Sequence, residues 1–320
     1  MEVMDWIDNA FGVAQQWLFE TVFSPVIHAL GLSMFIEEGF EAAEWFLLGG
    51  IEVAVLFLLL RPLEKWQPAE IPTPRLERFR AVRTDVIYTL LHRLGGFSLL
   101  TFFLLTPLTD GLEAQLRLAG IPRFSLDALL PWLGTHALLQ FLMYLIILDF
   151  ADYWIHRGQH RINQWWALHA VHHSQRHMTF WSDNRNHVLD DLIRDVLRAL
   201  LALIIGVEPG QFVWLVIVSR AIESLAHANV RFSFGRWGRY LIVSPQFHRL
   251  HHGIGVGHEG SRQGVNFAVL LPAWDILFGT ADYRDQYPAT GIRDQLVGRN
   301  YGEGFWDQQW LGFKRLLGKA

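Results

Sequence analysis

The stretch HAVHH, residues 169–173, repeats its spacing as HRLHH at residues 248–252, and HRGQH at residues 156–160 precedes both. We refer to these three stretches as the histidine boxes. Residues three and four apart lie on the same face of an α-helix, so each box directs its imidazoles into a single arc. Converging imidazoles on a rigid helix are typical of a transition-metal site. The boxes therefore predict helices that hold metal.

The number of box histidines indicates how many metal ions the chain holds. A lone pair of histidines at i and i+4 is usually an accident of a polar surface, whereas three boxes joined by apolar segments favour a metal site. Together they supply eight imidazoles, namely His156, His160, His169, His172, His173, His248, His251 and His252. Because one ion takes about four to six ligands, eight imidazoles predict two ions.

The composition limits the class of protein and the kind of metal site. Hydrophobic residues make up 51% of the chain and charged residues only 18%, against about 25% charged residues in a typical soluble domain. The formal net charge of −4 gives no indication of a nucleic-acid partner. Because the chain has no cysteine, iron–sulfur clusters, thiolate-ligated haem and disulfides are excluded. Any metal must be held by His, Asp, Glu or Asn.

Four apolar stretches are candidates for membrane spans, since about 20 apolar residues cross a bilayer. They are Ala42–Leu60, Val86–Leu108, Leu130–Phe150 and Leu197–Val218. The last is interrupted at Glu208-Pro209-Gly210, which is typical of the tip of a helical hairpin. The pattern predicts an all-α integral membrane bundle with about four transmembrane helices.

The same pattern predicts three segments and an orientation. We expect residues 1–40 to form amphipathic helices at the membrane surface, residues 41–285 a single membrane catalytic domain, and residues 286–320 an interfacial tail. Arginine-rich loops, which favour the cytoplasmic side, follow the first span at residues 61–83 and surround the first two boxes. The boxes should therefore form a cytosolic, metal-binding cap. The preference for Arg over Lys and the lack of a reticulum retrieval signal favour a bacterial inner membrane.

The order of the boxes resembles that of the fatty acid hydroxylase / sterol desaturase superfamily of membrane di-iron enzymes. Other stretches similar to that family are Asp152-Tyr-Trp-Ile-His-Arg157, His227-Ala-Asn-Val230, Pro245-Gln-Phe-His-Arg-Leu-His-His252 and Trp274-Asp-Ile-Leu-Phe-Gly-Thr280. The resemblance extends from the second predicted span to the last of these motifs. Many relatives carry Asp-x-Asn-Tyr/Phe-Gly after the last box, whereas this chain has Gly-Val-Asn-Phe-Ala, which weakens inference about the substrate.

The resemblance implies a reaction, cofactors and partners. Family members use O2 and two iron ions to hydroxylate or desaturate C–H bonds of lipids. Their electrons come from a separate donor protein, either cytochrome b5-like or a ferredoxin with a flavoprotein reductase. An all-nitrogen site also accepts zinc, so zinc is expected to substitute for iron in purified protein. The resemblance leaves open which lipid is the substrate, and whether it is hydroxylated or desaturated.

Further side chains are candidates for the site. The family motif makes His227 a ninth ligand, and His187 is a candidate for a tenth. His177 and His258 are expected at the surface or behind the ligands, and His28, His92 and His136 are assigned no role. Four polar residues are candidates to orient ligands from behind: Asp152, four residues before His156; Glu223, four before His227; Asp191, four after His187; and Asn266. Glu223 is equally compatible with a solvated charge.

Two other classes of function remain open. A membrane hydrolase would use two zinc ions to activate water, although such sites usually mix carboxylates with histidines. A metal transporter or metal-binding membrane protein would carry its histidines near the middle of its spans, whereas here they lie in Arg-rich segments at the span ends. Consumption of O2 during turnover would separate the oxygenase from the hydrolase.

Overall fold

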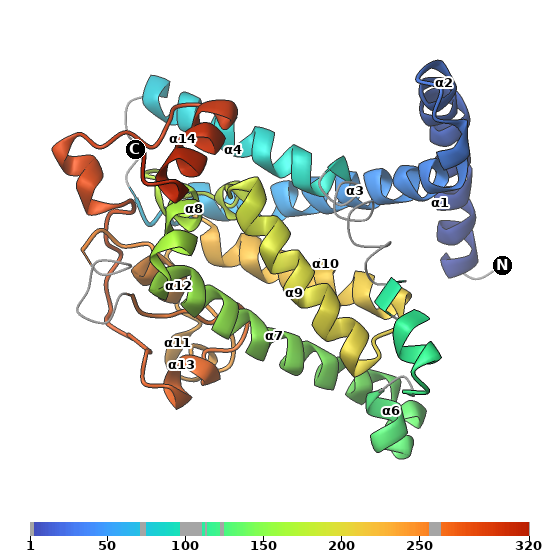
Figure 1. The fold of residues 1–320 in the computed structure, drawn as a ribbon. Helices are drawn as coiled ribbons and strands as arrows, with labels where there is room; N and C mark the ends of the chain where they lie inside the picture. Colours follow the sequence, from blue (N-terminus) through green and yellow to red (C-terminus); the bar gives the residue numbers. More distant parts are fainter. Residues whose placement is uncertain are drawn as a thin grey trace. The chain divides into compact units, whose positions relative to one another are not determined.

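The computed structural model describes residues 3–70, 75–96, 111–112, 114–121, 125–255 and 264–319. These residues form helices and loops without a β-strand, apart from one isolated bridge between Gly253 and Thr290 (Figure 1). The predicted all-α class is therefore confirmed for this part of the chain. The chain divides into two compact units, one of residues 1–58 with 90–103 and one of residues 59–89 with 104–320.

The first unit contains α1 (Val3–Leu18), α2 (Ser24–Ala29) and the first part of α3 (Ile36–Trp66). A π-helix at Phe19–Phe23 joins α1 to α2, and a short 3-10 helix at Ser33–Phe35 precedes α3. Gln15 Nε2 donates a hydrogen bond to the carbonyl oxygen of Phe40 at 3.1 Å. The outer face of α1 leaves Trp6 and Trp17 exposed. The placement of residues 1–40 at a membrane surface stays a prediction.

Two helices are long and apolar enough to cross a membrane. They are α3, extended by its preceding turn to Ser33–Trp66, and α7 (Ala137–Arg161). The first contains the predicted span Ala42–Leu60, and the second begins within the predicted span Leu130–Phe150. The predicted span Val86–Leu108 begins on α4 (Arg75–Arg93), but most of it lies outside the described residues. A total of four spans and a cytosolic cap stay predictions.

The second unit contains a helical hairpin at the position where the sequence predicted one. Helices α9 (Val188–Ile205) and α10 (Pro209–His227) meet at a tight turn. Gly206 ends α9 with φ of 79°, a left-handed conformation that glycine adopts without steric cost. Pro209 occupies the first position of α10, where a missing N–H is harmless. Glu208-Pro209-Gly210 therefore starts the second helix of the hairpin.

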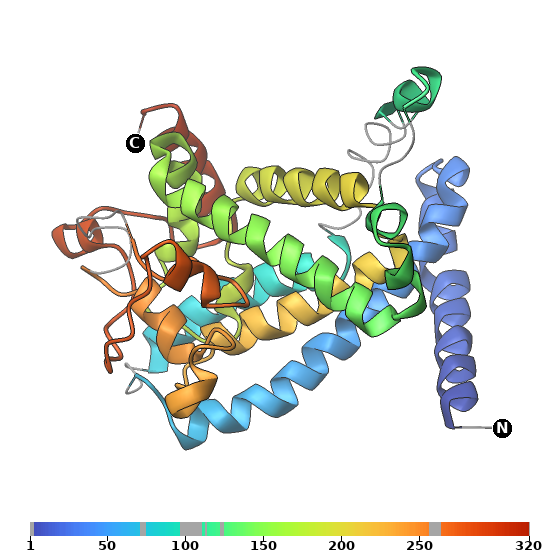
Figure 2. The ribbon, with the colours of Figure 1, turned by 90° about the horizontal axis from the view of Figure 1, so that it is seen from below.

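An apolar core joins the hairpin to α7, and Figure 2 shows α7 lying beside α9 and α10 from below. Helix α7 supplies Tyr144 and Leu148, α9 supplies Ala202 and Ile205, and α10 supplies Leu215, all buried. The short α6 (Leu126–Leu129) and a 3-10 helix at Pro131–Thr135 pack beside them. This core surrounds the tip of the hairpin, at the ends of α9 and α10 that lie away from Asp190 and His227, and it holds the three helices together.

The remaining helices bring the boxes together. Helix α8 (Asn163–His173) begins just after α7, because Ile162 is extended and breaks the helix. Helix α12 (Pro245–His251) begins with Ser244, whose Oγ accepts a hydrogen bond from the backbone N–H of Phe247 at 3.2 Å. Smaller elements follow in the chain: α11 (Gly235–Gly238), α13 (Ala273–Leu277), α14 (Phe305–Leu316) and 3-10 helices at Ser182–Asn184 and Arg293–Val297.

Helix α14 packs closely on α8. A Cβ atom at Gly312 would lie 2.5 Å from Cδ2 of His187 and 3.3 Å from Cγ2 of Val171. Glycine therefore permits the approach of the C-terminal helix to the helix that carries the second box. The same helix leaves Trp306 and Trp310 exposed on its other side, and the interfacial location of residues 286–320 stays a prediction.

Candidate metal centre

Nine histidines gather into two adjacent clusters in the part of the chain that the structure describes. Cluster A comprises His156, His160, His169, His173 and His251; cluster B comprises His172, His227, His248 and His252. Within each cluster, one ring nitrogen from every histidine lies within 4.8 Å of all the others, and every member is buried. The members are the eight box histidines and His227, so the structure brings together all nine histidines that the sequence and the family resemblance singled out.

The division between the clusters follows the helical repeat. In each box the two histidines four residues apart join the same cluster, because one helical turn separates them on one face. The histidine between them, His172 in the second box and His251 in the third, points about 100° away from its neighbour in sequence and joins the other cluster. Boxes two and three therefore each contribute to both clusters and hold them side by side.

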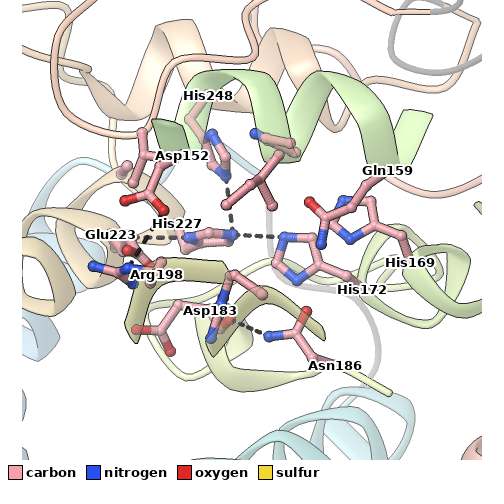
Figure 3. A pocket seen from close by; sticks show the side chains of 15 residues that line it. Asp152, Gln159, His169, His172, Asp183, Asn186, Arg198, Glu223, His227 and His248 are labelled. Carbon is pink, nitrogen blue, oxygen red and sulfur yellow. Dashed lines mark hydrogen bonds and ion pairs between the residues drawn. The ribbon is translucent and has the colours of Figure 1, made fainter. Parts of the chain in front are cut away.

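The distances within cluster B match those between ligands of one ion. The Nε2 atoms of His227 and His172 are 3.2 Å apart, those of His248 and His227 are 2.9 Å apart, and those of His252 and His248 are 3.1 Å apart. Figure 3 shows His172, His227 and His248 converging. Imidazole nitrogens lie about 2.0–2.1 Å from a bound metal, so neighbouring ligands are about 2.9–3.4 Å apart. The imidazoles of cluster B fit a metal ion.

Backbone carbonyls determine which nitrogen of the cluster B histidines faces inward. Nδ1 of His227 donates to the carbonyl oxygen of Glu223 at 2.8 Å, and Nδ1 of His172 donates to that of Arg185 at 3.2 Å. A carbonyl oxygen only accepts, so each Nδ1 carries the hydrogen and each Nε2 presents a lone pair. Two lone pairs that face each other at 3.2 Å repel unless a cation lies between them. The tautomers therefore fit a metal as well as the distances do.

Cluster A has the same arrangement. Nδ1 of His156 donates to the carbonyl oxygen of Phe267 at 2.8 Å, and Nδ1 of His251 donates to that of Val265 at 2.7 Å. Nε2 of His251 is 3.1 Å from Nε2 of His173. The loop around residue 266 thus holds one histidine from the first box and one from the third with their lone pairs directed into the cluster.

One ligand is held by a carboxylate that the sequence analysis did not select. Nδ1 of His169 lies 2.9 Å from Oδ2 of Asp190, whose other oxygen accepts hydrogen bonds from Gln159 and Trp165 at 2.7 Å each. Nε2 of His169 is buried without a hydrogen-bond partner, which suits a nitrogen that serves as a metal ligand. Asp190 and Asp191 are neighbours on α9, and only the way the helix is turned decides which carboxylate faces His169. The sequence alone therefore could not show that Asp190 is the partner of this histidine.

Burial keeps the imidazoles of the clusters neutral, and therefore able to bind metal, at neutral pH. Removal from water, reinforced by neighbouring imidazoles, lowers the pKa of His172, His173, His248 and His252 well below the ordinary value of histidine. Only the neutral ring has a free lone pair, so a low pKa removes the competition between protons and metal.

His187 lies outside both clusters. Its Nε2 donates to the carbonyl oxygen of Gln309 on α14 at 2.8 Å, and its Nδ1 accepts from the backbone N–H of Leu189 at 3.1 Å. Both ring nitrogens are therefore engaged in capping α9 and holding α14. His177 lies 3.7 Å from Glu70, His258 is outside the described residues, and His28, His92 and His136 belong to neither cluster.

The carboxylates expected behind the ligands make other contacts. Asp152 pairs with Arg198 at 3.4 Å, and a carbonyl, that of Phe267, takes the hydrogen bond of His156 instead. Glu223 orients His227 through its backbone oxygen, not its carboxylate. Asp191 pairs with Arg194 at 3.1 Å. The prediction that these carboxylates orient ligands is therefore not reflected in the hydrogen bonds of the structure.

Asn266 supports the site through the backbone. It has a positive φ of 56°, a conformation that asparagine adopts more readily than most residues. Its Nδ2 donates to the carbonyl oxygens of Phe247 and Asp282 at 2.9 Å each. The residue thereby ties the loop whose carbonyls hold His156 and His251 to the helix of the third box.

The donor set is consistent with redox-active metal. Both clusters consist of imidazoles only, a set that suits iron, zinc or copper and does not suit magnesium or calcium. Five and four nitrogens are enough for one ion each. The residues therefore fit the pair of irons that the resemblance implies, with zinc as a possible substitute.

The fold and these clusters define an α-helical protein with a double histidine metal site, and comparisons with known proteins place it in a family. The fatty acid hydroxylase family matches residues 141–280. The chain is 27% identical to ornithine lipid hydroxylase OlsE of Rhizobium tropici over 234 residues, 73% of this chain and 65% of that protein. It is 28% identical to human alkylglycerol monooxygenase over 144 residues, 45% of this chain and 31% of that one.

A third relative is fatty acid hydroxylase vlmA of a Lecanicillium species, 26% identical over 165 residues, 47% of this chain and 42% of that one. The matches thus span less than two thirds of these relatives. No solved structure matches the chain. The chain belongs to the fatty acid hydroxylase superfamily, whose motifs the sequence analysis identified.

Proposed function

We propose that this protein is a membrane-bound, di-iron, O2-dependent oxygenase that acts on a C–H bond of a lipid. The observation that carries the proposal is the pair of buried all-histidine clusters. Membership of the superfamily supports it, as do the names of the relatives, which are hydroxylases and monooxygenases of lipids. Those names favour hydroxylation over desaturation.

Each cluster would hold one iron. The five histidines of cluster A and the four of cluster B are the proposed ligands, and His187 is not among them. Bound iron would supply the chemistry with O2 that no side chain can supply on its own. The protein's part is to bury all nine imidazoles and to orient five of them, through the carbonyl oxygens of Phe267, Val265, Glu223 and Arg185 and the carboxylate of Asp190.

The surroundings would protect the reaction from water. All nine histidines are buried, and exclusion of water prevents side reactions of a strong oxidant. Helix α7 connects the site to the apolar bundle, because its first half packs in the core and its last turns carry the first box. A lipid in the membrane would approach along this bundle. Electrons would come from a separate protein, cytochrome b5-like or a ferredoxin with its flavoprotein reductase.

We further propose that α3 and α7 cross a bacterial inner membrane with the clusters facing the cytoplasm. The absence of cysteine from the sequence makes this easy to test. Single cysteines at exposed Arg161, near the clusters, and at Leu138, at the other end of α7, should react with an impermeant thiol reagent from opposite sides of the membrane. Reaction of both from the same side would contradict a spanning α7.

The deciding experiment measures metal content and O2 uptake in protein prepared with iron, a reducing system and mixed lipids. Two irons per chain and lipid-dependent O2 uptake would support the oxygenase. Two tightly held zinc ions, with no O2 uptake after reconstitution with iron and a competent donor, would favour a di-zinc membrane hydrolase. One weakly held ion per chain would contradict the double site.

A further inference from the structure

A charged cavity lies beside both clusters. It has a volume of about 60 Å³, and its wall includes histidines of cluster A, His156 and His169, and of cluster B, His172, His227 and His248. Five charged side chains also line it, namely Asp152, Asp183, Glu223, Arg194 and Arg198. Figure 3 labels Asp152, Asp183, Glu223 and Arg198 beside the converging histidines. The space nearest the metal ligands is therefore polar.

Four of the five charges lie on the three helices of the apolar bundle, and Asp183 lies on the 3-10 helix at Ser182–Asn184. Asp152 precedes His156 by one turn of α7, and Glu223 precedes His227 by one turn of α10. Arg194 and Arg198 lie one turn apart on α9, which packs on α7. Burying charged side chains in an apolar helical bundle costs free energy, and such residues usually have a function. A hydrocarbon chain that filled this cavity would have to be buried against ionised groups, which is unfavourable.

Two oppositely charged side chains of this cavity face each other without a hydrogen bond between them. Oδ1 of Asp152 and Nε of Arg198 are 3.4 Å apart, and both are buried without a hydrogen-bond partner. The residues are 5% and 8% exposed. Buried polar atoms are nearly always hydrogen-bonded, so this pair leaves one acceptor and one donor for a ligand. Arg194, by contrast, lies 3.1 Å from Asp191 and contributes mainly to the local charge.

We propose that the cavity binds a small zwitterionic lipid head group, so that the oxidised C–H bond lies in or beside the head group. An anionic or carbonyl oxygen of the ligand would accept from Arg198, and an ammonium group would donate to Asp152, with Glu223 nearby. A water needs about 10–15 Å³, so 60 Å³ admits a group of roughly four or five heavy atoms. The inference rests on the proposed function, because it names the substrate class of that site.

The first test is binding, measured without turnover on the full-length protein loaded with redox-inert zinc in detergent. The probes are ornithine lipid, the same lipid with its ammonium acetylated, and a neutral alkylglycerol, each followed by tryptophan fluorescence. Charge-assisted hydrogen bonds predict that ornithine lipid binds about tenfold or more tightly than either neutral probe. Equal affinities for the three lipids would overturn the inference, and this measurement needs no variant.

The second test is Arg198→Gln, which should weaken ornithine lipid binding about tenfold and leave the alkylglycerol unaffected. Arg198→Lys should recover part of the loss, because it restores the charge without the planar donor. Arg161→Gln is the control, because it removes an exposed charge from the end of α7 outside the cavity. If Arg198→Gln does not fold, Asp152→Asn with Arg198→Gln removes both charges and leaves neither buried alone.

The outcomes separate this inference from the proposed function. Lipid-dependent O2 uptake with equal binding of all three probes would leave the oxygenase standing and overturn the head-group site. If Arg198→Gln weakened the binding of the charged and the neutral lipids equally, the arginine would have a structural role. Unchanged binding with an altered pH dependence of turnover would assign the charges to proton transfer. Either of the last two results would overturn the inference.

Discussion

The carboxylate of Asp190 lies 2.9 Å from Nδ1 of His169, one of the five histidines of cluster A. The contact links the start of α9 to the second histidine box on α8. It also commits His169 to the tautomer whose Nε2 points into the cluster. Asp190 thus gives His169 a charged hydrogen-bond partner, whereas Nδ1 of His156, His172, His227 and His251 donates to a backbone carbonyl oxygen.

Replacing Asp190 by Asn should weaken metal binding by cluster A about 10–100-fold, the usual effect of losing a partner of a ligating histidine. Asn still accepts a hydrogen bond but lacks the charge. Competition with a chelator would measure the affinity of each ion. Asp191→Asn is the matched control, because it removes the neighbouring carboxylate, which pairs with Arg194, by the same chemical change. If Asp191→Asn lowered the metal affinity of cluster A more than Asp190→Asn does, Asp191 would be the residue that orients His169.

The ligand set was predictable from the sequence because it is local. The spacing His-x-x-His-His places imidazoles on one side of a helix whatever the rest of the chain does, and all eight box histidines reach the clusters. His227 stands alone in its helix, and only its resemblance to a family motif pointed to it. The hairpin was predictable for the same reason, since Glu208-Pro209-Gly210 is a strong local break.

The groups behind the ligands could not be predicted. Four of them are backbone carbonyls, and every residue has a carbonyl, so residue type carries no signal. Phe267 lies 111 residues from His156 in sequence, and only the packing of the last loop against α7 brings them together. The carboxylates chosen by their spacing of four, Asp152 and Glu223, line the cavity beside the clusters, because a residue one turn before a histidine can also face a neighbouring cavity.

His187 provides a test of the nine-ligand set. Replacing it by Ala should leave two metal ions per chain and reduce the free energy of unfolding by about 1 kcal/mol, the usual effect of losing a helix cap. The change also removes the hydrogen bond to Gln309 on α14. Metal analysis and thermal unfolding would measure the two quantities. His227→Ala is the comparison and should lose the ion of cluster B. Loss of an ion from His187→Ala would make His187 a tenth ligand.

The buried pair of Asp85 and Arg185 should position a ligand of cluster B. Nε of Arg185 lies 2.6 Å from Oδ1 of Asp85, and the carbonyl oxygen of Arg185 accepts from Nδ1 of His172. Asp85→Asn leaves a buried arginine uncompensated, which should cost about 3–5 kcal/mol of stability. Metal affinity should fall at cluster B and not at cluster A.

The double change Asp85→Asn with Arg185→Gln is the control for this pair. It leaves no buried charge alone, so it should be less destabilising than Asp85→Asn. Denaturant unfolding and chelator competition on both variants would compare them. An equal loss of affinity at both clusters would show general destabilisation and would contradict a positioning role for the pair.

Metal-free protein should lose stability as the pH falls through about 6.5. Burial, reinforced by neighbouring imidazoles, lowers the pKa of His172, His173, His248 and His252 well below the ordinary value. The unfolded chain takes up protons at these rings near pH 6.5 and the folded chain does not, so the free energy of unfolding decreases with pH below that point. Unfolding of the metal-free protein between about pH 8 and 5 would measure the slope. Replacing the buried His252 by Asn should reduce the slope. A metal-free protein equally stable at both ends of this range would contradict the burial of neutral imidazoles.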